Sequence, residues 1–173
     1  MRYIKSLILM LGVIFLIGAG GCKSHKKDKG NSLPDDMVKV ELGSPKSDMD
    51  RVVEEAMSWL GTPYAYGAAE KGKATDCSGL VMVVFDNVMS VKMPRNSAKQ
   101  AEFCMELEDA LVGAGDLVFF AIGGDKNKIS HVGIMIDGEK FIHASASKGV
   151  IVSEMTTPYY QRHFKMYGRV PKE

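Results

Sequence analysis

The feature that most constrains the fold is a change in the spacing of apolar residues part-way along the chain. After residue 46, apolar residues recur every three or four positions, which predicts helices over residues 47–61, 77–88 and 97–108. After residue 115, short β-rich runs separated by turn residues predict strands within residues 116–122, 131–137, 140–146, 149–155 and 164–170. Because the helices come first and the strands second, we expect an α+β fold with an antiparallel sheet.

The first predicted helix has one apolar face and recognisable ends. Ser47 or Asp48 is suited to cap its start, and Gly61 is suited to end it. The face that we expect to pack inward consists of Met49, Val52, Val53, Ala56, Met57 and Leu60.

The N-terminus has the composition of a secretory signal. Arg2 and Lys5 precede an apolar run over residues 7–17, and small residues lead to Cys22. The run is shorter than the about 20 residues that span a bilayer. Ending on Cys resembles a bacterial lipoprotein signal, in which that Cys is lipidated, although Ala19 stands where Leu is usual. The alternative is an ordinary signal or uncleaved anchor with an incidental Cys. In each case the protein leaves the cytoplasm.

We therefore expect three parts: a signal at 1–22, a flexible tether at 23–47, and a single domain at 48–173. The lysine cluster within 23–30 is either solvated or in contact with anionic lipid headgroups. With 22 Lys and Arg against 21 Asp and Glu, the charge is near neutral, so nothing suggests a nucleic-acid surface.

Cys77 lies directly before an apolar run, in the stretch "ATDCSGLVMVVF". We expect it in the first turn of a helix, where unsatisfied N–H groups and the helix dipole stabilise a thiolate. The same location lowers a cysteine pKa and makes the sulfur a nucleophile. Two alternatives stay open: Cys77 is a small buried residue, or it forms a disulfide with Cys104 of the next predicted helix.

A cysteine nucleophile needs a histidine base and a polar group to orient that base. His131 opens one predicted strand and His143 lies in the next, whereas we expect His163 to be structural or exposed. A two-residue turn at Asp137 and Gly138 would place the first two histidines on opposite faces. A three-residue turn pairs residue 136 with 140 and places them diagonally on one face. The catalytic interpretation requires the second register, for which Gly138 would supply a positive φ.

Around these residues the sequence resembles the NlpC family of bacterial cell-wall cysteine peptidases, a papain-like group. The resemblance runs from about residue 59 to 153, and the closing stretch 158–170 is similar to the lipoprotein DL-endopeptidase branch. It implies a papain-like fold with N-terminal helices packed on a central antiparallel sheet. The matching stretches occur in family order: "GTPYAYG", "TDCSGLV", "MPRNSAKQA", "AGDLVFF", "SHVGIMI" and "FIHASASKGV".

The resemblance implies roles for individual residues. Cys77 matches the nucleophile, His131 the base and His143 the third polar residue. Tyr64 matches a tyrosine near the thiol that assists substrate or oxyanion binding.

Two further positions, Asp76 and Ser78, match residues that line the peptide site, and in some members the aspartate recognises a free amine.

The sequence departs from the family where Gly67-Ala68 replaces a common Gly-Gly, and where the loop from 64 to 77 is about one residue longer than in close relatives. Both departures concern the substrate-side loop.

These matches imply a cysteine endopeptidase that hydrolyses stem or cross-link peptides of peptidoglycan through a Cys-His-His triad, without metal or cofactor. The bond implied is γ-D-glutamyl–diaminopimelate or a DL cross-link. The partners implied are peptidoglycan peptides and, through the lipid, a membrane of the cell envelope, with the protein a monomer. Two alternatives are a papain-like acyltransferase or amidase with another substrate, and a non-catalytic envelope binding module.

Overall fold

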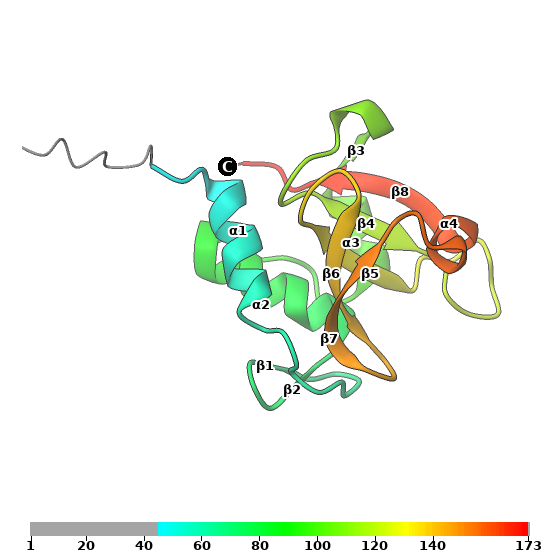
Figure 1. Ribbon diagram of the computed structural model, residues 1–173, viewed down its shortest axis with the longest axis horizontal. Helices are drawn as coiled ribbons and strands as arrows, with labels where there is room; N and C mark the ends of the chain where they lie inside the picture. Colours follow the sequence, from blue (N-terminus) through cyan, green and yellow to red (C-terminus); the bar gives the residue numbers. More distant parts are fainter. Residues whose placement is uncertain (1–44, 173) are drawn as a thin grey trace, which may run out of the picture. The chain divides into compact units, whose positions relative to one another are not determined.

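The computed structural model describes residues 45–172. The predicted signal, Cys22 and most of the predicted tether lie outside the described residues. The elements in chain order are α1 (Asp48–Met57), β1 (Ala69–Glu70), β2 (Ala74–Thr75), α2 (Cys77–Met89), α3 (Ser97–Phe103), β3 (Met105–Leu107), the 3₁₀ helix η1 (Asp109–Leu111), β4 (Leu117–Phe120), β5 (His131–Met135), β6 (Lys140–Ser145), β7 (Gly149–Glu154), α4 (Pro158–His163) and β8 (Phe164–Arg169) (Figure 1).

The six-stranded sheet has the strand order β3-β8-β4-β5-β6-β7, and all its neighbouring strands are antiparallel. The predicted α+β class is therefore confirmed, as are all five predicted strands. The prediction of one helix over residues 97–108 is wrong in its second part. Helix α3 ends at Phe103, and the next residues form β3 because they pair with the edge of β8.

The sheet is covered on both faces. Helices α1 and α2 lie together on one side of it, and α4 lies beyond its other side (Figure 1). Strand alternation divides the buried residues accordingly. The helix-side core contains Val52, Ala56, Leu80, Val84, Phe85, Phe119, Val132, Ile134 and Ile142. The smaller core on the opposite face contains Val118, Phe120, Met135, Phe141 and Tyr167, with Tyr160 of α4 packed against it.

Helix α1 starts where predicted and ends earlier. Ser47 is its N-cap, and it forms a capping box with Asp50 that satisfies backbone N–H groups at the helix start. The helix stops at Met57, so the predicted inward position of Leu60 is wrong: its exposed fraction is 47%. Trp59 is buried instead, and its indole N–H donates to Glu55 at 3.1 Å.

The turn between β5 and β6 has the register that brings the two histidines to one face. Ile134 pairs with Ile142 and Met135 with Phe141, and the backbone N–H of Ile136 donates to Lys140. The expected positive φ at Gly138 is wrong, because Gly138 is not among the glycines with positive φ. The Asp137 carboxylate stabilises the turn instead, by accepting the backbone N–H groups of Glu139 at 2.8 Å and Lys140 at 2.7 Å.

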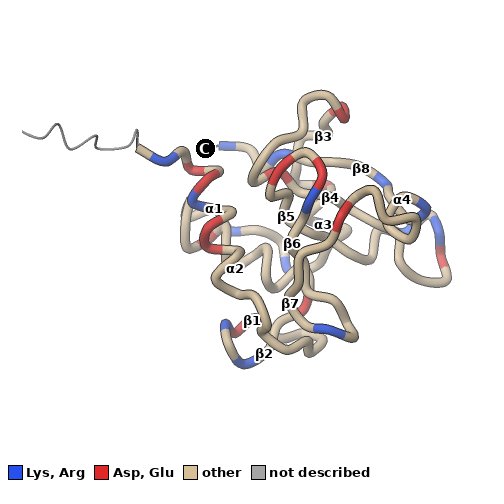
Figure 2. The backbone as a smooth tube through the Cα atoms, viewed as in Figure 1, with Lys and Arg blue, Asp and Glu red and all other residues tan. Residues whose placement is uncertain are grey.

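Charged residues of both signs are interspersed along the described chain (Figure 2). Asp116, only 1% exposed, accepts two hydrogen bonds of 2.7 Å from the Arg169 guanidinium, which ties the start of β4 to the end of β8. Within residues 45–172, no helix combines the length and the hydrophobicity that a membrane crossing requires.

Candidate active site

Cys77 is the first residue of α2 and is 8% exposed. The preceding Asp76 caps the helix by accepting the backbone N–H of Gly79 at 2.7 Å. Burial raises the pKa of the Cys77 thiol, and the Asp76 carboxylate adds to this rise. Hydrogen bonds from the backbone N–H groups of Val132, Ser78 and Cys77 itself act in the opposite direction. The sulfur therefore lies against the backbone of Val132 at the start of β5 and rests as a protonated thiol. The lowered pKa that a helix start predicts is wrong for Cys77, because burial outweighs the backbone N–H groups.

His131 and His143 are joined directly. Nε2 of His131 lies 2.8 Å from Nδ1 of His143, and the two rings are nearly perpendicular, at 88°. Burial lowers the pKa of His131 to about 4. Burial, together with the charge that His131 would carry, lowers the pKa of His143 to about 3. Both rings are neutral at pH 7, so the free ring nitrogen of His131 is able to accept a proton.

Two hydroxyl groups complete this arrangement, and sequence reasoning missed both. Nε2 of His143 lies 3.0 Å from Oγ of Ser153 on β7 and 3.1 Å from the hydroxyl of Tyr160 on α4. The Ser153 hydroxyl also donates to Tyr160 at 3.3 Å. Strand alternation from the β6–β7 pairing would have found Ser153. No spacing rule predicts Tyr160, because a separate helix supplies it.

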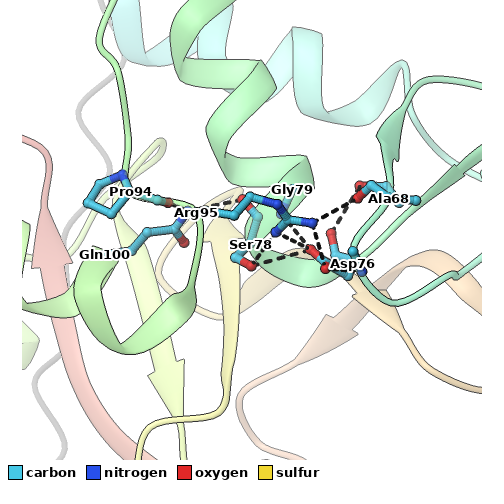
Figure 3. Close-up of polar contacts among 9 residues, drawn as sticks. Ala68, Asp76, Ser78, Gly79, Pro94, Arg95 and Gln100 are labelled. Atoms are coloured by element: carbon cyan, nitrogen blue, oxygen red, sulfur yellow. Dashed lines mark hydrogen bonds and ion pairs between the residues drawn. The ribbon is translucent and has the colours of Figure 1, made fainter.

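On the other side of Cys77, Arg95 holds the Asp76 carboxylate (Figure 3). Its two terminal nitrogens donate to the two carboxylate oxygens at 2.9 and 2.8 Å, and one of them also donates to Ser78 at 3.0 Å. Burial alone would raise the pKa of Asp76. Hydrogen bonds from Arg95 and from the backbone N–H groups of Gly79 and Gly67 outweigh burial and lower that pKa. Arg95 is a third residue of the candidate site that sequence reasoning missed.

Gln100, fully buried in α3, fixes the segment that carries Arg95. Its side-chain amide N–H group donates to the carbonyl oxygens of Ser78 at 3.0 Å and Pro94 at 2.8 Å (Figure 3). These bonds tie the chain before α3 to the first turn of α2.

The departure at Gly67-Ala68 is accommodated locally. Only Gly67 adopts a positive φ, of 83°, and its backbone N–H donates to Asp76 at 2.7 Å. Ala68 forms a turn with Ala65, and its carbonyl accepts the backbone N–H of Asp76 at 3.0 Å. A second glycine is therefore not needed at position 68.

Two cavities contain the candidate site residues. The first cavity, of about 500 Å³, contains Cys77 with Tyr64, Asp76, Ser78 and Arg95 in its wall. The second cavity, of about 870 Å³, contains both histidines, and its wall includes Ser145, Lys148, Ile151, Ser153 and Tyr160. Burial, followed by the charge that Cys77 would carry as a thiolate and the charge of Asp76, raises the pKa of Tyr64, so its hydroxyl stays protonated.

The other candidates lie outside both cavities. His163 is half-buried and bonds to the backbone carbonyl of Tyr159 at 2.6 Å, in keeping with the expected structural role. Both Cys77 and Cys104 are free thiols, so the alternative of a disulfide between them is wrong. Within the described part of the chain, no group of three His, Cys, Asp or Glu side chains could hold a metal ion.

Residues 61–169 match the model of the NlpC/P60 family. The chain belongs to the NlpC/P60 family.

Individual members of the NlpC/P60 family match most of the chain. It is 35% identical over 150 residues to a probable endopeptidase NlpC of Escherichia coli K12, covering 87% of this chain and 91% of that protein. It is 30% identical to the murein DD-endopeptidase MepS/murein LD-carboxypeptidase of the same strain, covering 98% and 94%.

A solved structure of an NLP/P60 family protein similar to lipoprotein, from Staphylococcus aureus, superposes with a TM-score of 0.65 and 29% identity. The match covers 75% of this chain and 45% of that one. The predicted papain-like fold is therefore confirmed.

Proposed function

We propose that this protein is a cysteine endopeptidase that hydrolyses peptide bonds of peptidoglycan, with Cys77 as nucleophile, His131 as base and His143 as the residue that orients the base. Two observations carry this proposal: the hydrogen bond from the backbone N–H of Val132, the residue after His131, to the Cys77 sulfur at the start of α2, and the 2.8 Å bond between the two histidines. Membership of a family whose relatives are named endopeptidases supports it.

The first step forms a covalent acyl-enzyme. The Cys77 sulfur attacks the carbonyl carbon of the scissile bond while its proton passes to His131. His131 then gives that proton to the leaving nitrogen as the carbon–nitrogen bond breaks. This leaves a thioester on Cys77 and a free amine. Water, activated by His131, hydrolyses the thioester to a carboxylic acid and restores the thiol.

Charge that develops on the carbonyl oxygen needs hydrogen-bond donors. The backbone N–H of Cys77 lies at the start of α2, where helix N–H groups have no partner within the helix. The protonated hydroxyl of Tyr64, in the same cavity, is the second proposed donor. Loss of one such donor typically costs about 3 kcal/mol of transition-state stabilisation.

The proposed substrates are stem or cross-link peptides, cleaved at γ-D-glutamyl–diaminopimelate or at a DL cross-link. The name of the MepS relative, a murein endopeptidase and carboxypeptidase, supports a peptidoglycan substrate. Both oxygens of Asp76 are already bonded to Arg95. We therefore propose that a free amine of the substrate binds next to this ion pair and not to a carboxylate without a partner.

We propose that the protein is a monomer held at the cell envelope. Residues 1–22 would act as a lipoprotein signal, Cys22 would carry the lipid, and residues 23–47 would form the tether. The Staphylococcus aureus neighbour is itself described as similar to a lipoprotein, which supports this location.

The test is mass spectrometry of peptidoglycan fragments after incubation with the full-length protein, beside Cys77→Ala and the matched control Cys104→Ala. We expect one defined peptide bond to be lost with the native protein and the control, and to be intact with Cys77→Ala. Unchanged fragments in all three samples would contradict hydrolysis and favour a binding module. Transfer of an acyl group to an added amine, without hydrolysis, would favour an acyltransferase.

A further inference from the structure

The second cavity has no role in the proposed attack on the carbonyl carbon. It contains His131 and His143 but not Cys77, whereas the first cavity contains Cys77 but neither histidine. The two proposed reacting side chains therefore line two different cavities. The Cys77 sulfur of the first cavity accepts the backbone N–H of Val132, which follows His131 of the second cavity in β5.

The chemistry of the two residues assigns a half of the substrate to each cavity. The acyl half becomes bonded to the Cys77 sulfur, so it lies in the first cavity. The amine half receives its proton from His131, so it departs on the side of the second cavity. We propose that the second cavity binds the amine half of the cleaved peptide, and that Lys148 binds a carboxylate on that half. This inference rests on the proposed function.

Lys148 is the cation nearest the reacting end of the second cavity. The register of β5 and β6, continued by three residue pairs, sets His131 opposite Ser145. The backbone N–H of Lys148 donates to the Ser145 carbonyl at 3.3 Å, one turn further along. Within residues 45–172, Lys148 forms no ion pair, so its ammonium group is available to a ligand.

The acidic residue of the same cavity lies too far away to neutralise Lys148. Glu154 is at the opposite end of β7, where its backbone lies opposite that of Lys140 in β6. At 3.3 Å per residue, the backbones of Gly149 and Glu154 are roughly 17 Å apart. The reacting end therefore presents a cation and the hydroxyl groups of Ser145 and Ser147, which together suit a carboxylate.

The wall between these ends includes two apolar residues of β7. Ile151 pairs with His143 across β6 and β7 and is half-exposed in the cavity, next to Val152. The alkyl part of an amino acid would pack there, while its carboxylate reaches Lys148. The ligand class that results is a short peptide with a free amine and a nearby carboxylate, such as diaminopimelyl-alanine.

The experiment compares three stem tetrapeptides with the full-length protein. One has free carboxylates, one has its terminal carboxylate amidated, and one has the diaminopimelate side-chain carboxylate amidated. One of the two amidated peptides lacks the carboxylate that binds Lys148. We expect kcat/KM for that peptide to be about tenfold lower than for the peptide with free carboxylates, chiefly because KM is higher. Lys148→Ala should remove this difference, while the control Lys165→Ala, an exposed residue of β8, should keep it.

A binding measurement separates this inference from the proposed function. Calorimetry with Cys77→Ser should detect diaminopimelyl-alanine, and binding should weaken about tenfold when Lys148→Ala is added. Cleavage without any carboxylate preference would overturn the inference and leave the proposed function standing. Lys148-dependent binding without cleavage of any peptide would support the inference and contradict the proposed function.

Discussion

At the scale of single residues, the positions of protons on two histidines decide whether Cys77 is activated. For His131 to accept the thiol proton, its Nε2 must carry a hydrogen and donate it to Nδ1 of His143. His143 must then carry its own hydrogen on Nε2, where Ser153 and Tyr160 offer oxygen acceptors. These two hydroxyls can therefore accept the Nε2 hydrogen in the tautomer that the proposed base role of His131 requires.

Removing the two hydroxyls tests this role. Because either oxygen can accept the single Nε2 hydrogen, we expect Ser153→Ala or Tyr160→Phe alone to lower kcat no more than about tenfold. The double variant leaves a buried donor unpaired, so we expect a loss of about a hundredfold, with KM little changed. Tyr159→Phe is the matched control. Equal activity of the double variant and the native protein would show that the hydroxyls do not orient His143.

The pH dependence of cleavage follows from the burial of His131. With its pKa lowered to about 4, His131 stays neutral at pH 5, so kcat/KM should change little between pH 7 and pH 5. A histidine with the ordinary pKa of about 6.5 would be mostly protonated there, and cleavage would fall roughly 30-fold. Initial rates measured across this interval distinguish the two. A steep loss near pH 6.5 would contradict a buried neutral base.

Local rules made Cys77, His131 and His143 candidates: a helix start, strand alternation and one of two possible turn registers. The resemblance to the family supplied the proposed role of each. Sequence reasoning missed Ser153, which strand alternation could have indicated, and it missed Arg95 and Tyr160, which no local rule indicates. Their contacts join elements that are far apart in the chain, and no periodicity reports such a meeting.

At the scale of elements, the packing of β5 against β6 sets the distance between the histidines. A Cβ atom on Gly133 would lie 2.6 Å from the Phe141 ring and 3.3 Å from Cβ of His143. A Cβ atom on Gly138, in the turn between the same strands, would meet nothing within 4 Å, and Gly138 has no positive φ.

These two glycines form a matched pair for mutation. We expect Gly133→Ala to lower the free energy of unfolding by about 1–3 kcal/mol, because the added methyl group overpacks the space between strands. It should also lower kcat, since the histidines would be displaced. Gly138→Ala should change neither quantity. Urea unfolding and initial rates test both, and equal stability of the two variants would contradict this account of the strand contact.

Elements with a strong hydrophobic period were predictable, and short ones were not. Strands β4 to β8 follow alternation or continuous apolar runs between turn residues. The sequence predicts a helix for the residues of β3, which is wrong. These three residues form a strand because they pair with β8, and that pairing leaves no signal in their own sequence. The two-residue strands β1 and β2 are too short for any period to be visible.

At the scale of the whole molecule, burying two neutral histidines makes stability depend on pH. In the unfolded chain, His131 and His143 have the ordinary pKa of about 6.5 and become protonated below that pH. In the folded protein the pKa is about 4 for His131 and about 3 for His143. The stability that these neutral histidines contribute is therefore complete above pH 6.5, and it is lost progressively as the pH falls below 6.5 toward the pKa values of the folded protein.

We expect the free energy of unfolding at pH 4.5 to be about 2–3 kcal/mol lower than at pH 7.5 from His131 alone. Urea unfolding at several pH values measures this change. The double variant His131→Gln with His143→Gln should flatten the dependence above pH 4.5. Constant stability of the native protein over that interval would show that the histidines are not buried in neutral form.

The order of helices before strands was enough to predict the α+β class, since the order along the chain limits how layers form. The sequence did not reveal that α4 would cover the second face of the sheet. Its six residues carry aromatic side chains whose packing partners, such as Phe120 and Phe141, lie on strands well before it in the chain.

The most direct test of Cys77 as nucleophile is rapid-quench mass spectrometry of the intact protein during cleavage of a stem tetrapeptide. We predict a transient mass increase equal to the acyl half of the peptide, located on the peptide that contains Cys77. The increase should also occur in Cys104→Ala and be absent in Cys77→Ser. Cleavage by Cys77→Ser, or an adduct on any other residue, would contradict the proposed mechanism.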